Sequence, residues 1–266
     1  MKDDKKVVLI TGASSGIGLS TAKKFIEQGY IVYGIGRKIF ELDGLNYIKL
    51  DLRDYEVVNN TIKEIVAKEG KIDIVISNAG LGISGPVEMA EVNEIKKIMD
   101  VNFLGSVNIV KAVLPYMRER QKGRIVCTSS VGSFVALPFQ AFYSASKAAL
   151  DTFVDATRSE VKAFGVEIFS VHPGDVSTGF TGARTKQPLD TDNPYATTCE
   201  KCVGQMEKDE QGGMSADYVA DKIYKIATKK HYKLRNVIGP KYKLFTFLLN
   251  LMPRKMKEWA VRKMYF

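Results

Sequence analysis

Short apolar runs alternate with amphipathic stretches through much of this chain of 266 residues. The runs have the length of strands, whereas the stretches between them repeat apolar residues at helical spacing. Strands that are apolar on both faces and joined by helices form a parallel sheet covered on two sides. The alternation therefore predicts an α/β fold: a doubly wound parallel β-sheet of Rossmann type, built as a single domain.

Seven strands and four helices are expected in this sheet and its cover. The predicted strands are Val7–Thr11, Ile31–Ile35, Tyr47–Leu50, Ile72–Ser77, Arg124–Thr128, Val166–Val171 and Val237–Ile238. The predicted helices are Ile17–Gln28, Tyr55–Lys68, about 91–120, and Ala141–Phe164. Residues 1–240 would form the main domain, and residues 241–266 an extension of it.

The segment Gly174–Gly213 interrupts this rhythm, because it is polar, rich in Thr and Gly, and without a persistent period. Long loops in compact domains are usually functional or mobile. Since this one follows the carboxyl end of a strand, we expect a substrate-covering loop over about 174–215.

The positive charge of the chain is concentrated in its tail. The chain carries 39 Lys or Arg and 30 Asp or Glu, but from Lys229 to Phe266 there are 11 basic side chains and one acid, Glu258. The rest of the chain is therefore nearly neutral. This distribution argues against a general nucleic-acid-binding surface.

Two further features restrict the location of the protein. Three cysteines are too few for a disulfide framework. The segment Met1–Lys6 runs directly into the first predicted strand without the pattern of a signal peptide. Both features favour the cytoplasm.

Three glycines, Gly12, Gly16 and Gly18, fall between the first strand and the first helix. Without side chains the backbone can turn tightly and approach a pyrophosphate, which the helix N-terminus then stabilises. The spacing is G-x-x-x-G-x-G rather than G-x-G-x-x-G. A tight turn without a ligand has the same letters, but the strand before and the helix after favour a dinucleotide site.

The end of the second strand indicates which dinucleotide is bound. The chain reads Val32-Tyr-Gly-Ile-Gly36-Arg37-Lys38, with two cations where NAD-binding folds carry an acid. An arginine can hold a 2′-phosphate through paired, charge-assisted hydrogen bonds. We therefore predict NADP(H) in preference to NAD(H). The alternative is that Arg37 and Lys38 are a solvated turn.

Tyr143 and Lys147 are four residues apart on a predicted helix and therefore share one face. A free phenol titrates near pH ~10. A neighbouring ammonium would stabilise the phenolate and lower the pKa of Tyr143 toward neutrality. Tyr143 could then donate a proton to a ketone oxygen during reduction, or accept one from an alcohol during oxidation. In isolation, such a pair is usually only part of a surface.

The segments Thr11–Gly18, Asn78–Gly80 and Tyr143–Lys147, with Asn102 and Ser130, occur in one order that resembles the short-chain dehydrogenase/reductase family. The resemblance covers about residues 7–180. It implies an NADP(H)-dependent oxidoreductase that interconverts a secondary alcohol and a ketone by hydride transfer.

The resemblance assigns catalytic roles to Asn102, Ser130, Tyr143 and Lys147. Ser130, thirteen positions before Tyr143, would be a second donor to the carbonyl oxygen. Lys147 would also bond the nicotinamide ribose, and the backbone carbonyl of Asn102 would anchor a water to Lys147. No metal is expected.

We expect the cofactor to bind residues that follow several of the predicted strands. Asp51 resembles the adenine contact of the family, although it could instead cap the helix at Tyr55. The residues assigned to cofactor binding are Gly12, Ser14, Ser15, Gly16, Ile17, Gly18, Arg37, Lys38, Asp51, Leu52, Asn78, Ala79, Gly80, Tyr143, Lys147, Pro173, Gly174, Val176 and Thr178.

Two other features suggest chemistry that we do not favour. Cys199 and Cys202 have the spacing of half a zinc site or of a redox pair, but no second cysteine pair exists. His172 could be a base, but we interpret it as a residue at the end of a strand.

The tail combines apolar and basic residues at helical spacing on both sides of Pro253. Its apolar run is shorter than the ~20 residues that a membrane span needs. It could lie on an anionic bilayer as a basic amphipathic helix, cover an apolar substrate pocket, or contact another subunit. Its apolar residues include Leu244, Phe245, Phe247, Leu248, Leu249, Leu251, Met252, Met256, Trp259, Ala260 and Met264.

An extension of this kind resembles the hydroxysteroid and retinol dehydrogenase branch of the family. The resemblance implies a bulky apolar ketone or alcohol, such as a steroid or bile acid, and a homodimer or homotetramer built through the helices near 91–120 and 141–164. Two alternatives remain: a carbonyl reductase for small ketones, and a nucleotide-binding regulator without turnover.

Overall fold

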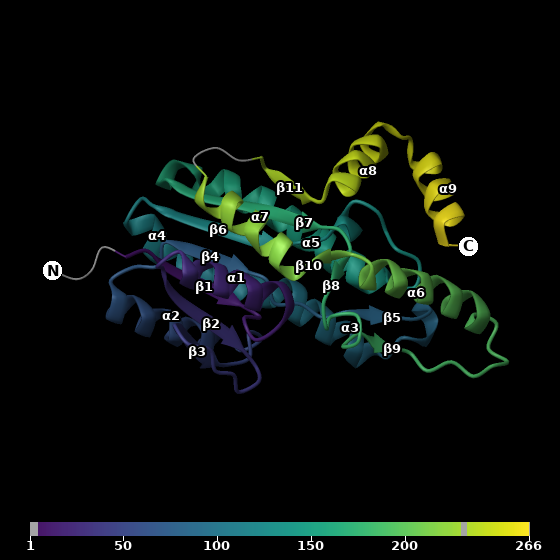
Figure 1. Cartoon of the computed structure of the whole chain (residues 1–266), viewed down its shortest axis with the longest axis horizontal. Helices are drawn as coiled ribbons and strands as arrows, with labels where there is room; N and C mark the ends of the chain where they lie inside the picture. Colours follow the sequence, from purple (N-terminus) through teal and green to yellow (C-terminus); the bar gives the residue numbers. More distant parts are fainter. Residues whose placement is uncertain (1–4, 230–232, 266) are drawn as a thin grey trace.

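The computed structural model describes residues 5–229 and 233–265, and a seven-stranded sheet runs through it in the order β11-β7-β6-β4-β1-β2-β3 (Figure 1). The segment before Lys5, used above to argue for the cytoplasm, and Phe266 at the end of the tail lie outside the described residues. All pairs in the sheet are parallel, so the predicted doubly wound sheet is confirmed. Its strands are β1 (Val7–Thr11), β2 (Ile31–Gly36), β3 (Leu45–Lys49), β4 (Ile74–Ser77), β6 (Gly123–Thr128), β7 (Val166–Pro173) and β11 (Arg235–Ile238).

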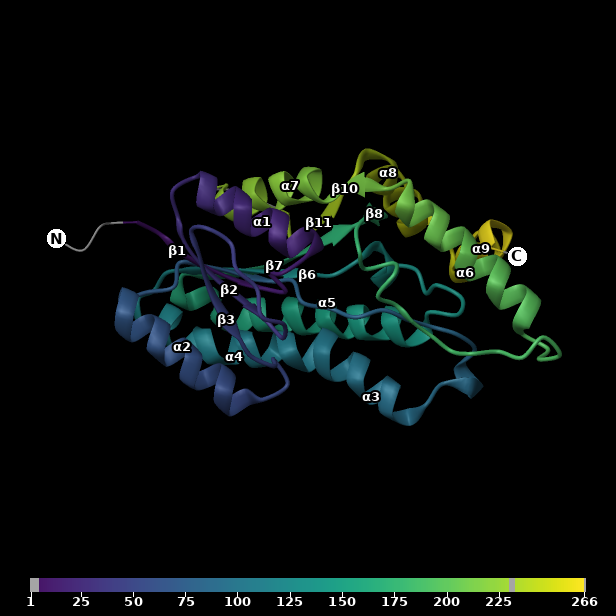
Figure 2. The same ribbon diagram turned by 60° about the horizontal axis from the view of Figure 1, so that its bottom comes forward.

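Helices cover both faces of the sheet (Figure 2). One face carries α1 (Gly16–Glu27) and α7 (Ala216–Thr228), and the other carries α2 (Tyr55–Glu69), α4 (Gly105–Glu119) and α5 (Ala141–Val161), which ends in the 3₁₀ turn Lys162–Phe164. Successive side chains of a strand point to opposite faces. In β1, Leu9 therefore enters the core beneath α2, α4 and α5, whereas Ile10 enters the core beneath α1 and α7.

The helix expected over 91–120 is interrupted in the middle. It consists of α3 (Val92–Met99), a π-helical turn (Asp100–Leu104) and α4. By length and composition alone, Val92–Glu119 could cross a membrane, but half of its most apolar window is buried inside the domain. The segment packs against α2 and α5, so we interpret it as a core helix.

The expectation of a loop over residues 174–213 is wrong for its second half. Residues 196–211 form the helix α6 (Ala196–Gln211), which follows the short strands β8 (Val176–Ser177) and β9 (Thr185–Lys186). β8 pairs with β10 (Met214–Ser215), and β9 pairs with β5 (Ile83–Ser84). The buried face of α6 is formed by Cys199, Cys202, Val203 and Met206. Their spacing is helical, so the two cysteines mark the inner side of a helix.

The tail folds as two helices, one on each side of Pro253, in agreement with the helical spacing of its sequence. They are α8 (Pro240–Leu251) and α9 (Arg254–Tyr265). Leu249 and Val261 form a small apolar cluster with Val135 of the main body. The extension is therefore packed onto the domain.

Gly18 lies where the start of α1 approaches the end of β1. A Cβ at this position would overlap the carbonyl oxygen of Gly12 and lie 2.7 Å from Nδ2 of Asn78. We expect Gly18→Ala to lower the free energy of unfolding by about 1–3 kcal/mol, because the Gly12 carbonyl oxygen can move away only if the backbone of the turn shifts.

A matched control is Gly204→Ala in α6, where no described atom lies within 4 Å of an added Cβ. This change should leave the free energy unaltered or raise it by about 0.5–1 kcal/mol, since Ala favours helices over Gly. Urea denaturation of the two variants measures the difference. Equal stabilities would contradict the crowding inferred at Gly18.

Candidate active site

A cavity of about 720 Å³ opens at the carboxyl ends of the central strands and extends to the tail helices. In doubly wound sheets ligands bind at this edge. All the predicted site residues line the cavity except two, Gly18 and Asn102. The sequence motifs are therefore brought together in one place, although they are spread over residues 11–178.

The glycine turn is tied to the end of β4 by the hydroxyl of Thr11. This oxygen accepts the backbone N–H groups of Asn78 at 2.9 Å and Ala79 at 3.0 Å. Gly12 and Gly16 have φ values of +68° and +52°, which favour glycine. The turn thus leaves backbone exposed to the cavity in the way that a pyrophosphate requires. Gly18 does not line the cavity, but it packs against the carbonyl oxygen of Gly12 and so allows α1 to begin close to this turn.

The cations expected to hold a 2′-phosphate stand at the rim of this cavity. Arg37 and Lys38 follow β2 and are exposed, and Ser14 lies beside them on the cavity wall. Two exposed cations beside a glycine turn could hold a phosphate group.

Asp51 also lines the cavity, but its carboxylate forms an ion pair with Arg53 at 2.7 Å. The hydrogen bond from Arg53 lowers the pKa of Asp51. The alternative that Asp51 caps the next helix is wrong, because the cap of α2 is Asp54, which accepts the N–H of Val57 at 3.1 Å.

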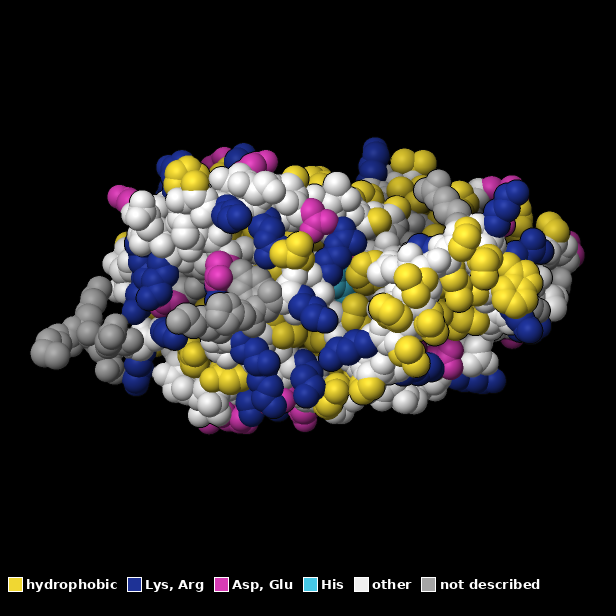
Figure 3. Space-filling model, turned by 90° about the horizontal axis from the view of Figure 1, so that it is seen from above, with side chains coloured by type: hydrophobic (Ala, Val, Ile, Leu, Met, Phe, Trp, Pro, Cys, Tyr) yellow, Lys and Arg dark blue, Asp and Glu magenta, His cyan; other side chains and the backbone are white. Residues whose placement is uncertain are grey.

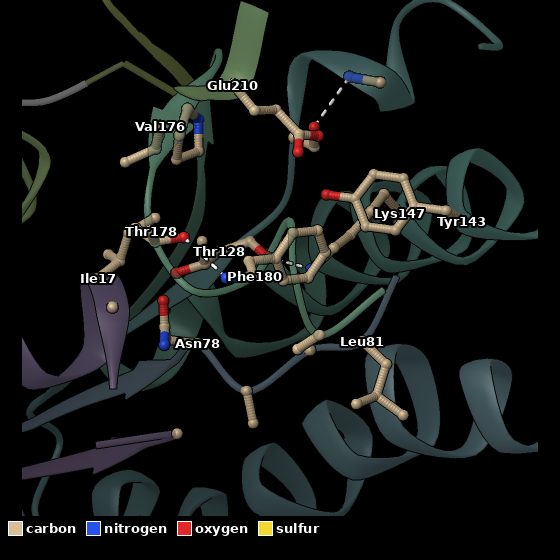
Figure 4. Close-up of a pocket in the computed structure, with 18 of the residues that line it drawn as sticks. Ile17, Asn78, Leu81, Thr128, Tyr143, Lys147, Val176, Thr178, Phe180 and Glu210 are labelled. Carbon is tan, nitrogen blue, oxygen red and sulfur yellow. Dashed lines mark hydrogen bonds between the residues drawn. The ribbon is translucent and has the colours of Figure 1, made fainter. Parts of the chain in front are cut away.

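Tyr143 and Lys147 both project from α5 into the cavity (Figure 4). The Lys147 ammonium donates to the carbonyl oxygen of Thr128 at 2.8 Å and lies 6.0 Å from the centre of the Tyr143 ring. Burial lowers the pKa of Lys147 to about 8. The pair is therefore on one face, as the sequence predicted.

The expected lowering of the Tyr143 pKa is not found in this structure. Burial raises the pKa of Tyr143, the carboxylates of Glu210 and Asp175 raise it further, and a hydrogen bond with Ser130 opposes them. Lys147 does not offset the burial, because its ammonium is directed at Thr128. Tyr143 consequently keeps its proton at neutral pH, which suits a proton donor.

Ser130 lies at the end of β6, where its Oγ accepts the N–H of Gly132 at 3.0 Å. It lines the cavity and is a hydrogen-bond partner of Tyr143. The two hydroxyls can therefore both donate to one ligand oxygen. The adjacent Ser129 is buried, and its Oγ donates to the backbone oxygen of Lys147 at 3.4 Å.

Asn102 is fully buried in the π-helical turn, behind the cavity wall. Its Oδ1 accepts the N–H of Leu81 at 2.7 Å, and its Nδ2 donates to the Leu81 carbonyl and to Oγ of Ser146, both at 3.0 Å. The side chain thus positions the cavity-lining Leu81. The role of the Asn102 carbonyl in a water relay stays a prediction.

The sequence analysis did not identify a group of acidic residues that lines the same cavity as Tyr143. Asp175, Asp209 and Glu210 line the cavity, and burial raises the pKa of Asp175, as do the other two carboxylates. Glu210 pairs with the buried Arg184 and accepts the hydroxyl of Thr181 at 2.6 Å. No motif marked these positions: Asp209 and Glu210 lie in α6, which the sequence predicted as a loop, and Asp175 lies between β7 and β8.

The tail helices form a wall of the same cavity, one of the alternatives left open by the sequence. Phe245, Val261 and Tyr265 line it. Tyr242 also lies on the wall, and its hydroxyl donates to Asp175. Its ring crosses Gly174 so closely that a Cβ there would overlap it. Gly174, which the sequence analysis assigned to cofactor binding, therefore also allows the tail helix α8 to pack closely against the domain.

His172 and the two cysteines of α6, for which the sequence analysis did not favour a chemical role, are buried in the structure. His172 is buried inside β7, outside the cavity, with its Nε2 3.0 Å from both carboxylate oxygens of Asp151. Cys199 and Cys202 are buried on α6. Across residues 5–229 and 233–265, no group of three His, Cys, Asp or Glu side chains is arranged to hold a metal ion.

A dinucleotide cradle that opens beside a Ser, Tyr and Lys group defines a Rossmann-type oxidoreductase. The family model described as short chain dehydrogenase matches residues 6–189. The chain belongs to the short-chain dehydrogenase family.

Individual relatives support this assignment. A 3-ketodihydrosphingosine reductase of Bacteroides thetaiotaomicron is 38% identical over 98% of both chains. Rat estradiol 17-beta-dehydrogenase 1 is 36% identical over 66% of this chain and 56% of its own.

Solved structures share the fold. A short-chain dehydrogenase from Streptomyces avermitilis has a TM-score of 0.86 at 28% identity and covers 98% of both chains. The structure of ElxO with NADP bound has a TM-score of 0.75 at 25% identity, covering 90% of this chain and 99% of its own.

Proposed function

We propose that this protein is an NADP(H)-dependent reductase of a long-chain ketone that carries an amino group beside the carbonyl. The observation that carries the proposal is a group of carboxylates in a cavity with an apolar wall: Asp175 and Glu210 act on Tyr143, and Asp209 lines the same cavity. The relative of 38% identity, named for 3-ketodihydrosphingosine, supports the same class of substrate.

The chemistry of such a substrate matches the two ends of the cavity. An amine on the carbon next to a ketone is protonated at neutral pH and lies within a few bonds of the carbonyl oxygen. If that oxygen accepts hydrogen bonds from Tyr143 and Ser130, the ammonium falls near Asp175 and Glu210, the carboxylates that raise the pKa of Tyr143. The alkyl chain can lie along Phe245 and Val261.

The protein's own groups act on the ketone oxygen. NADPH, when bound, supplies the hydride. Tyr143 donates the proton to the oxygen as negative charge develops there, and the hydroxyl of Ser130 stabilises that charge as a second donor. The Lys147 ammonium is held by Thr128 at the edge of the site and can bond a ribose. Arg37 and Lys38 favour the 2′-phosphate of NADP(H).

A steroid ketone is the second candidate, because the tail supplies an apolar wall and the rat relative is named for estradiol. A neutral steroid, however, would bring apolar surface against the Asp175 carboxylate, which accepts the Tyr242 hydroxyl but forms no ion pair with a described residue. Burying unpaired charge is costly. The amino ketone is therefore preferred over the steroid that the sequence suggested.

The cofactor preference can be tested at the end of β2. Arg37→Ala with Lys38→Ala should raise the Kd of NADPH about tenfold or more, since paired bonds to a phosphate are lost, and should leave the Kd of NADH nearly unchanged. Both constants are measured by nicotinamide fluorescence.

The matched control is Lys23→Ala with Lys63→Ala, which removes two exposed lysines that do not line the cavity. It should change neither constant. A double variant at 37 and 38 that still prefers NADPH as strongly as the wild type would refute this role of the two cations.

The pH dependence of reduction should follow Lys147. Its pKa is lowered to about 8, so the ammonium is present below that pH and lost above it, while the raised pKa of Tyr143 keeps the phenol protonated. We expect kcat/KM for ketone reduction to be flat below pH about 7 and to fall through pH about 8.

Lys147→Arg should move this fall to higher pH, because a guanidinium keeps its proton. Steady-state rates in a constant-ionic-strength buffer series give the profile. A wild-type profile that stays flat to pH about 10 would exclude Lys147 as the titrating group.

The substrate class is tested by following NADPH oxidation at 340 nm with four ketones: 3-ketodihydrosphingosine, its N-acetyl derivative, an unsubstituted ketone of equal chain length, and a 17-ketosteroid. We expect the free amine to have the highest kcat/KM, by about tenfold or more over the other long-chain ketones, because its ammonium would pair with a partly buried carboxylate.

Two variants make this result interpretable. Asp175→Asn should reduce the preference for the free amine and keep turnover of the unsubstituted ketone, whereas Tyr143→Phe should abolish turnover of all four and still bind NADPH. Faster turnover of the steroid would replace the amino ketone by the second candidate. Absence of turnover on all four would leave the nucleotide-binding regulator.

A further inference from the structure

We infer that the outer face of α8 and α9 is a docking surface for an anionic lipid bilayer. This face is called the tail face below and consists of Leu244, Phe247, Leu248, Leu251, Met256, Trp259 and Met264. The inference about binding does not depend on the identity of the substrate.

The tail face is an exceptional concentration of exposed apolar groups. Of the 17 large hydrophobic side chains that are exposed in the described part of the chain, seven belong to it, although it spans only residues 244–264. Leu251 is 70% exposed and Trp259 62%. Figure 3 shows a broad hydrophobic patch over α8 and α9, bordered by Lys and Arg. Contiguous patches of this kind mark interaction surfaces.

The opposite sides of the same helices are used for packing, so the orientation of the tail face is set. Leu249 is 2% exposed and Val261 8%, and both pack in the cluster with Val135. Since the inner sides are occupied by the body of the domain, the outer apolar side chains cannot be buried by a small rotation of either helix. They need an external partner to leave water.

The charge around the tail face selects an anionic bilayer as that partner. Residues 240–266 contain seven Lys or Arg and a single acid, Glu258. Lys241, Lys255 and Lys263 are exposed beside the apolar side chains, and the Lys263 ammonium lies 5.3 Å from the centre of the Trp259 ring. Basic side chains around an apolar helix face are attracted to anionic headgroups. Two copies joined through this face would instead bring two strongly basic surfaces together.

The tail face is continuous with the cavity. Met264 is 51% exposed and also lines the cavity, together with Val261 and Tyr265 of the same helix. A bilayer bound here would therefore lie next to the apolar wall of the active site. If the proposed function holds, a lipid with a long alkyl chain could pass from the bilayer into the cavity along α9, without crossing water.

Vesicle co-sedimentation of the full chain, without any substrate, tests the surface. We expect binding to vesicles of phosphatidylcholine with phosphatidylglycerol, weakening as salt is raised, and little binding to phosphatidylcholine alone. Leu251→Asp with Trp259→Asp should lower the partition coefficient about tenfold or more, because both charges would enter the bilayer interface.

The matched control is Val92→Asp with Leu234→Asp, which places the same charges at two exposed apolar residues outside the tail face. It should bind vesicles almost as the wild type does. Lys255→Glu with Lys263→Glu, which leaves the apolar side chains intact, should remove the preference for anionic vesicles. Retained NADPH binding reports that each variant is folded.

Three results would overturn the inference. The first is unchanged vesicle binding in the Leu251 and Trp259 variant. The second is equal binding of the wild type to neutral and anionic vesicles. The third is absence of vesicle binding together with a smaller sedimenting species in that variant, which would make the face a contact between copies. Since no substrate is present, these results do not depend on the outcome of the ketone assays.

Discussion

The active-site end of the structure depends on the close approach of two strand ends, which the hydroxyl of Thr11 holds together. Its oxygen accepts the N–H groups of both Asn78 and Ala79, so the chain after β4 lies against the glycine turn after β1. This approach requires that Gly12 and Gly18 have no side chains, because each would meet the neighbouring backbone or Asn78. The nucleotide cradle, and the distance from it to Tyr143 and Lys147 on the other side of the sheet edge, follow from this contact.

The cavity beyond the cradle has two chemically different parts. The part near α6 carries the carboxylates of Asp209 and Glu210, and behind it the buried Arg184 forms ion pairs with Glu210 and Glu207. The part near the tail is apolar and is formed by α8 and α9. Tyr143 lines the same cavity, and its raised pKa reflects both its burial and the carboxylates of Glu210 and Asp175. A ligand with one cationic end and one long apolar end is complementary to this division.

Most of the fold and the family motifs could be predicted from the sequence, because both depend on local patterns. Strands apolar on two faces are recognisable from their letters, and the boundaries of β1 were predicted to the residue. The predictions of secondary structure were wrong where tertiary packing determines the structure. The helix α6 was not recognised, because most of its residues are polar and only a narrow face at helical spacing is buried. The strand β3 begins at Leu45 rather than at Tyr47. The alternative role of Asp51 as the cap of α2 is also excluded, because Asp54 caps this helix.

The sequence by itself determined the parallel sheet, the glycine turn, the Tyr143 and Lys147 pair and the basic character of the tail. These depend on residue type and on spacing along one element. Only the tertiary structure decided that Lys147 bonds Thr128 instead of neutralising Tyr143, that Asp175 and Glu210 face the reacting hydroxyl, and that the tail covers the cavity with one side while exposing the other. The physical reason is that electrostatic interactions and burial depend on distances between elements that are remote in sequence, and no local pattern encodes those distances.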